Sequence, residues 1–139
     1  MKNINKFGMF ENHFKKNYIG PDKINRINHK LGIKKIDLST INLPDESFLS
    51  YNSQDYVLIY GFDTTIDNSN FDIVYLRDFM GINPDHSEPC FYNQDWYINE
   101  SFAKKTLENK WYLIRKNYIK NLCGINPELY KNSNLPSAI

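Results

Sequence analysis

The sequence predicts an α+β fold: a single domain, residues 1–139, dominated by helices and containing a small sheet. Three observations lead to this prediction. Apolar residues recur at steps of three and four over several segments. One run, residues 55–62, is rich in β-branched and aromatic residues and lies between polar turn residues. The length of 139 residues and the 41% hydrophobic content suit one buried core.

An aromatic helix is predicted near the N-terminus, over residues 5–18. Its aromatic residues are spaced by three and four positions, which places them on one face of a helix. We expect this face to be buried. The residues concerned are Phe7, Phe10, Phe14 and Tyr18.

The next predicted helix, residues 21–31, begins with Pro21, whose missing N–H costs nothing at the first helical position. Its end is predicted at Gly32, because glycine readily takes the left-handed conformation of a Schellman motif and the following Ile33 can pack back on the helix. The side chains that this helix is expected to bury are Ile24, Ile27 and Leu31.

Two further helices are predicted in the second half of the chain. Residues 70–80 follow a capping residue, either Ser69 or Asn70, and end at another Gly-Ile step. Residues 99–109 begin at Asn99, and the apolar residues on the helix would be Phe102, Ala103 and Leu107. Both segments have the apolar spacing of amphipathic helices.

The strand predicted at residues 55–62 needs partners in a sheet. Two segments are available, the run KKIDLSTINL at residues 34–43 and the run WYLI at residues 111–114. The second run alternates as a strand does but leads into a helical pattern that ends at Gly124. We therefore expect a short extended entry followed by a helix.

The net charge of +1 conceals a strong segregation of charge along the chain. Residues 1–36 carry a net charge of +7, residues 37–103 carry −11, and residues 104–139 carry +5. Either the basic ends fold onto the acidic middle and neutralise it, or a basic surface is left for a partner.

Several function classes are disfavoured by composition. No apolar run approaches the roughly 18 residues that cross a bilayer, and the N-terminal sequence lacks the pattern of a signal peptide, so we expect a cytoplasmic protein without a membrane partner. The two cysteines, Cys90 and Cys123, are too few for a disulfide framework and are expected to be free thiols. Because the chain ends on the apolar run NLPSAI, it is also expected to be a fragment of a longer protein.

The stretch YIGPDKINRINHKLGI combines a Gly-Pro step with several cations and a helical apolar stripe. Gly20 can leave backbone donors accessible, and the N-terminus of the following helix carries partial positive charge. Basic side chains surround this corner, so it could hold a phosphate. The residues expected to bind nucleic acid are Lys15, Lys16, Gly20, Lys23, Arg26 and Lys30.

This stretch resembles the helix-hairpin-helix motif over residues 15–33, with Ile19, Gly20 and Pro21 at the hairpin. The resemblance implies that backbone N–H groups grip a nucleic-acid phosphate without strong sequence preference. Tyr18 departs from the motif, because it stands where the family has its first glycine. The alternative is an ordinary corner between two helices with solvated lysines, and a helix-turn-helix fits less well because Arg26 and a histidine fall where that motif buries its residues.

Two other interpretations stay open, a metal-dependent phosphoryl-transfer enzyme or nuclease and a protein-interaction module. Carboxylates after the predicted strand could hold Mg²⁺, although they also suit turns and helix caps; they are Asp63, Asp67 and Asp72. A zinc or nucleophile site is disfavoured in the segment that contains His86, Glu88, Cys90 and Asp95. We expect no cofactor and a binding role rather than a catalytic one. As an accessory module, the protein would dock a partner through its acidic middle and the aromatic segment CFYNQDWY.

Overall fold

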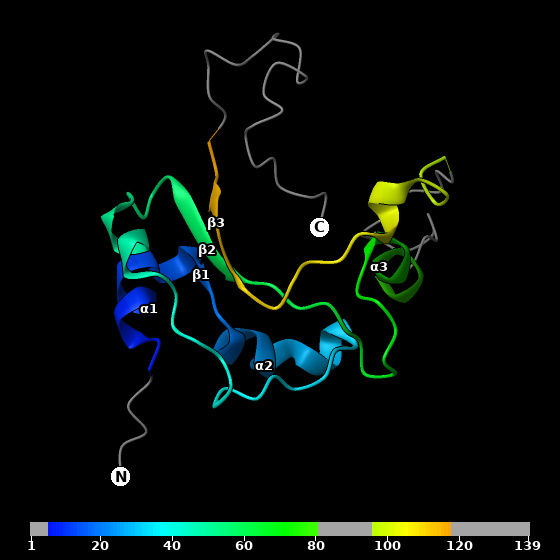
Figure 1. Ribbon diagram of the computed structural model, residues 1–139, viewed down its shortest axis with the longest axis horizontal. Coiled ribbons are helices and arrows are strands. Elements are labelled where there is room, and N and C mark those ends of the chain that lie inside the picture. Colours follow the sequence, from blue (N-terminus) through cyan, green and yellow to red (C-terminus); the bar gives the residue numbers. More distant parts are fainter. Residues whose placement is uncertain (1–5, 81–95, 118–139) are drawn as a thin grey trace, which may run out of the picture. The chain divides into compact units, whose positions relative to one another are not determined.

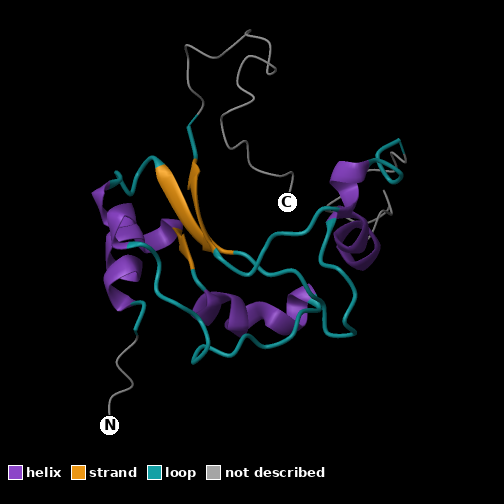
Figure 2. Ribbon diagram, viewed as in Figure 1, coloured by secondary structure: helices purple, strands orange, loops and turns teal. Residues whose placement is uncertain are grey.

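The computed structural model describes residues 6–80 and 96–117 of the chain (Figure 1). Within these ranges it contains three α-helices, three short 3₁₀ helices and one three-stranded mixed sheet, which confirms the predicted α+β class (Figure 2). None of the described helices has the length and apolar character needed to cross a membrane.

Contacts divide the described residues into two compact units. The first unit contains residues 6–23, 37–60 and 111–117, and the second contains residues 24–36, 61–80 and 96–110. Helix α2 (Pro21–Leu31) contributes its first three residues to the first unit and the rest to the second. A single domain over residues 1–139 stays a prediction.

The sheet of the first unit consists of β1 (Tyr18–Ile19), β2 (Tyr56–Tyr60) and β3 (Trp111–Arg115), in that spatial order (Figure 2). Strand β1 runs parallel to β2, whereas β3 runs antiparallel to it. Leu58 of β2 is paired with Tyr18 on one side and with Leu113 on the other, and it is fully buried. The predicted strand at 55–62 and the extended run at 111–114 are therefore confirmed.

The prediction of a strand at residues 34–43 is wrong, because polar side chains bind the backbone groups that a sheet would need. In the second unit, the Asn25 amide accepts a hydrogen bond from the Ile36 N–H at 2.7 Å and donates one to the Ile36 carbonyl at 2.8 Å. In the first unit, Asp37 accepts from the Ser39 N–H at 2.9 Å and closes a turn. The place beside β2 is taken by β1 instead.

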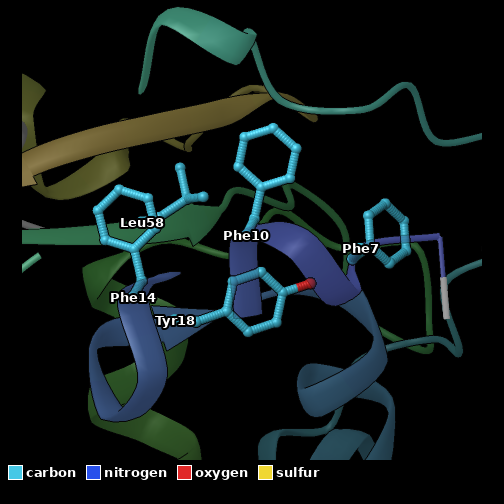
Figure 3. Packing of buried hydrophobic residues seen from close by; sticks show 5 residues of the cluster. All are labelled: Phe7, Phe10, Phe14, Tyr18 and Leu58. Carbon is cyan, nitrogen blue, oxygen red and sulfur yellow. The ribbon is translucent and has the colours of Figure 1, made fainter. Parts of the chain in front are cut away.

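An aromatic cluster forms the core of the first unit, as Figure 3 shows. Helix α1 (Gly8–Phe14) and its flanks supply four rings, each 1% exposed, and β2 supplies Leu58. The prediction that these rings share a buried face is confirmed, but the helix is shorter than predicted. It stops because Lys15 takes a φ of 51°, after which the chain forms a 3₁₀ turn (Lys15–Asn17) and enters β1 with Tyr18. The four rings are those of Phe7, Phe10, Phe14 and Tyr18.

Trp111, the first residue of β3, extends this aromatic cluster. Its ring lies 5.6 Å from the ring of Phe7 and 5.2 Å from that of Tyr60. Its indole N–H donates a hydrogen bond to the Asn42 carbonyl at 2.8 Å. The polar end of this half-buried ring therefore fixes a loop that has no regular secondary structure.

The predicted bounds of α2 are confirmed, including the Schellman motif at its end. Gly32 has a φ of +63°. The Ile33 N–H donates to the Asn28 carbonyl at 3.1 Å, which is the 6→1 hydrogen bond of this motif. Ile24 and Ile33 are buried, but the prediction that Ile27 is buried is wrong, because it is 43% exposed. The apolar face of the helix is narrower than its sequence indicates.

Helix α3 (Ile73–Met80) begins three residues later than predicted, and its cap is neither Ser69 nor Asn70. The Asp72 carboxylate accepts a hydrogen bond from the Tyr75 N–H at 2.8 Å, the contact of an N-cap residue. Ser69 is used earlier, where its carbonyl accepts from the Thr65 N–H at 2.9 Å. Ser69, one of the two predicted caps, therefore belongs to the turn before the helix.

The predicted helix at residues 99–109 is wrong in extent, since the structure contains a single 3₁₀ helix, Ser101–Lys104. Ala103 is fully buried, and the helix ends at Lys105, whose backbone is extended. The predicted helix after residue 115, its end at Gly124, and the Gly-Ile step after Met80 lie outside the described residues.

The aromatic cluster should carry much of the stability of the first unit. Phe10→Ala should lower the free energy of unfolding by roughly 3 to 5 kcal/mol, because it removes a fully buried ring. Met9→Ala is the matched control on the same helix; Met9 is 53% exposed, and its loss should cost less than about 0.5 kcal/mol. Urea denaturation followed by circular dichroism measures both, and equal losses would contradict this account of the core.

Candidate nucleic-acid interface

The corner between β1 and α2 is closed by the side chain of Tyr18. Gly20 is buried, and a Cβ atom added there would lie 1.9 Å from the Tyr18 hydroxyl oxygen and 2.1 Å from Cζ. The Tyr18 hydroxyl donates a hydrogen bond to Oδ1 of Asp22 at 2.8 Å, which holds the ring over the glycine. The expectation that Gly20 is open to a phosphate is therefore wrong. Glycine is needed here because the tyrosine ring occupies the space of a side chain.

Carboxylates already occupy the positive end of α2. Asp22 lies in its first turn, where negative charge is most favourable. Lys23 forms an ion pair with Glu11 at 3.5 Å, and its ammonium lies 5.1 Å from the centre of the Tyr18 ring. These two carboxylates repel a further anion at the helix N-terminus. Sequence reasoning missed them, although an acidic residue directly after a helix-initiating proline is a recognisable first-turn signal.

Three cations predicted to bind nucleic acid lie along one face of α2. Lys23, Arg26 and Lys30 are spaced by three and four residues, so they share a face of the helix. Arg26 and Lys30 are exposed, and neither has a hydrogen-bond or ion-pair partner within the part of the chain that the structure describes. The sequence-predicted residues on the helix are thus brought together.

Lys15 and Lys16 belong to the 3₁₀ turn that follows α1. Both side chains are exposed, and the carbonyl of Lys15 accepts a hydrogen bond from the Lys23 ammonium at 3.4 Å. Lys23 therefore faces Glu11 and this carbonyl at once, which makes it less available to a ligand than Lys15 or Lys16.

The acidic middle of the chain uses its carboxylates locally. Within each unit, no ion pair joins a described cation of residues 1–36 to a described carboxylate of residues 37–103. The aspartates bind hydroxyl, amide and backbone N–H donors instead. Hydrogen bonds from Ser39 and Ser47 lower the pKa values of the Asp37 and Asp45 carboxyls below the ordinary range, so both stay ionised in neutral solution.

The three carboxylates suggested for a metal do not form a ligand cluster. Asp63 accepts hydrogen bonds from Thr64 at 2.7 Å and from Asn109 at 3.0 Å. Asp67 accepts from the Thr65 hydroxyl within its own turn, and Asp72 caps α3. Among the residues described, no group of three or more histidine, cysteine, aspartate or glutamate side chains could hold a metal ion. The candidates His86, Glu88, Cys90 and Asp95 lie outside the described residues.

Comparisons with known proteins returned no relative. The chain matches no model of a protein family, no curated protein and no solved structure. Function has to be argued from the residues themselves.

The contact between Tyr18 and Gly20 can be tested by a double-mutant cycle. Gly20→Ala should destabilise the chain by about 1 to 3 kcal/mol, because the added methyl group overlaps a ring that is fixed on both sides. In a Tyr18→Leu background the same change should cost far less, since the overlapping ring atoms are absent. Chemical denaturation of the four proteins measures the coupling. An additive cycle would show that the ring does not restrict Gly20.

Tyr18 should also make stability depend on alkaline pH. Burial raises the pKa of the Tyr18 phenol, and its hydrogen bond to Asp22 and the charges of Asp22 and Glu11 raise it further. Above pH about 10, the unfolded chain releases this proton whereas the folded chain retains it, so stability falls as the pH rises. Tyr18→Phe should flatten this decline, and Tyr51→Phe, at an exposed tyrosine, should leave it unchanged. Thermal melts between neutral and alkaline pH measure this dependence. If stability fell as steeply with pH in Tyr18→Phe as in the unaltered chain, the decline could not be assigned to Tyr18.

Proposed function

We propose that this protein binds the phosphate backbone of nucleic acids, without strong sequence preference, through the cationic face of α2. Arg26 and Lys30 are the main contacts in this proposal, and Lys15, Lys16 and Lys23 add positive charge. Lysine and arginine contacts to phosphate give affinity and orientation but do not distinguish bases.

One observation carries the proposal: Arg26 and Lys30 are exposed and form no ion pair with a described carboxylate of the acidic middle, although the charge of Lys6 acts on Asp37. A basic segment that the acidic middle neutralised would show such pairs. The resemblance to a helix-hairpin-helix motif adds support from sequence, but the mode of contact differs. Because Gly20 lies under Tyr18, the proposal relies on side-chain cations and not on backbone donors at the hairpin.

A cytoplasmic location belongs to this proposal as well. It rests on sequence: two cysteines in 139 residues suit a reducing compartment, where nucleic acids are also accessible.

A second candidate function is a protein-interaction or accessory module. It is favoured because exposed carboxylates of the acidic middle also lack ion pairs with described cations. Asp45 and Glu46 are exposed at the start of a 3₁₀ helix, and neither forms an ion pair with a described cation. A basic partner could dock there. Charge reversal at these two positions should abolish partner capture if this candidate is right, and should leave nucleic-acid binding intact if the first is right.

The first proposal predicts a specific change in salt dependence. Arg26→Gln together with Lys30→Gln should weaken binding to random-sequence oligonucleotides, single-stranded or duplex, uniformly and reduce the salt slope by about 2, because each phosphate contact contributes about 1. The control is Lys110→Gln with Arg115→Gln, which removes the same charge from other exposed positions. Fluorescence anisotropy at several salt concentrations measures both. Equal effects of the two pairs would reduce the proposal to non-specific charge, and absence of binding at low salt would exclude it.

A further inference from the structure

Two of the exposed aromatic side chains in the second unit, those of Trp96 and Phe102, lie close to each other; Phe79, also exposed, stacks on Tyr75 instead. Trp96 is 69% exposed and Phe102 is 37% exposed, and their ring centres lie 6.1 Å apart. Exposed apolar rings of this size leave a large apolar area in contact with water, which costs free energy. Their position suggests a surface that a ligand covers.

The backbone beneath these rings is held by consecutive hydrogen bonds. The Glu100 N–H donates to the Tyr97 carbonyl at 2.9 Å, and the Ala103 N–H donates to the Glu100 carbonyl at 3.1 Å. Ala103 is fully buried and anchors the 3₁₀ helix to the second unit. These hydrogen bonds order the backbone from Tyr97 to Ala103, which carries Phe102, and a surface that is ordered in advance loses less entropy when a ligand binds.

Cations accompany the rings. The Lys105 N–H donates to the Phe102 carbonyl at 3.2 Å, so the backbone of Lys105 closes the last turn of the 3₁₀ helix that carries Phe102. Lys104 and Lys105 are exposed and have no ion-pair partner within the described part of the chain. Glu100 is the exposed carboxylate at the start of this helix, and Glu108 is engaged by Lys110. Rings beside unpaired cations match the two parts of a nucleotide, its base and its phosphate.

We infer that Trp96 and Phe102 form a base-stacking surface and that the nucleic acid bound by this protein is single-stranded. This inference rests on the proposed function and gives its substrate class. Stacking requires an unpaired base, because the faces of paired bases inside a duplex are covered by their neighbours. Lys105 binds the phosphate that follows the stacked base. Because every base has an aromatic face, the surface tolerates any sequence, in agreement with backbone recognition by α2.

The test compares three probes on the full chain: a short oligo(dT), a DNA duplex of equal length and inorganic polyphosphate, which has charge but no bases. Trp96→Ala should weaken binding of oligo(dT) by roughly 5- to 100-fold and change polyphosphate binding by less than about twofold. Trp96→Tyr retains a ring and should restore most of the affinity. Ile66→Ala, at another exposed apolar residue of the second unit, is the control and should change nothing. Circular dichroism verifies that each variant is folded.

Failure of this inference and failure of the proposed function are separable in the same experiment. If the unaltered chain binds none of the three probes at low salt, the proposed function is wrong. If it binds all three but Trp96→Ala affects them equally, or leaves oligo(dT) binding unchanged, polyanion binding stands and the stacking surface is refuted. Binding of the duplex more tightly than oligo(dT) would also refute it.

Discussion

The position of the Tyr18 side chain is the constraint on which the first unit depends. Its ring belongs to the aromatic cluster, its backbone pairs with the central strand, and its hydroxyl donates to Asp22 in the first turn of α2. One residue thus joins the core, the sheet and the start of a helix. The same ring covers Gly20, so the corner that would suit a phosphate by sequence is filled by the protein's own side chain. In the proposed function, anion recognition at this end of the chain is therefore assigned to side-chain cations further along the helix.

Charge segregation persists in the folded chain because the acidic residues of the middle segment have structural tasks. Asp37 and Asp45 each accept from the N–H of the serine two residues later, and Asp72 caps α3, so neutral donors bind these carboxylates. Such hydrogen bonds stabilise the charged carboxylates, so these groups need no lysine partner. Folding to bury the aromatic core does not bring the basic and acidic segments into pairs among the described residues. The exposed cations of α2 are a direct consequence.

Local signals made part of the fold predictable. Pro21 and Gly32 set the bounds of α2, and the alternating and β-branched runs located β2 and the start of β3. Strand β1 was not predictable, because two residues carry no periodicity and its pairing with β2 joins distant segments. The cap of α3 was misassigned because Ser69, Asn70 and Asp72 are all good caps, and only the turn before the helix selects among them. At the candidate site, the exposure of Arg26 could be expected from its helical position, whereas the covering of Gly20 by Tyr18 depends on where the ring lies in the core.

The central claim is that the side-chain face of α2, and not the corner at Gly20, receives a phosphate backbone. Backbone amide chemical shifts, recorded while an oligonucleotide of random sequence is added at low salt, test this most directly. The account predicts that the amides of Arg26 and Lys30 shift strongly and saturate together, whereas the amide of Gly20 hardly moves. Largest shifts at Gly20 and Asp22, or no shifts along α2, would contradict it.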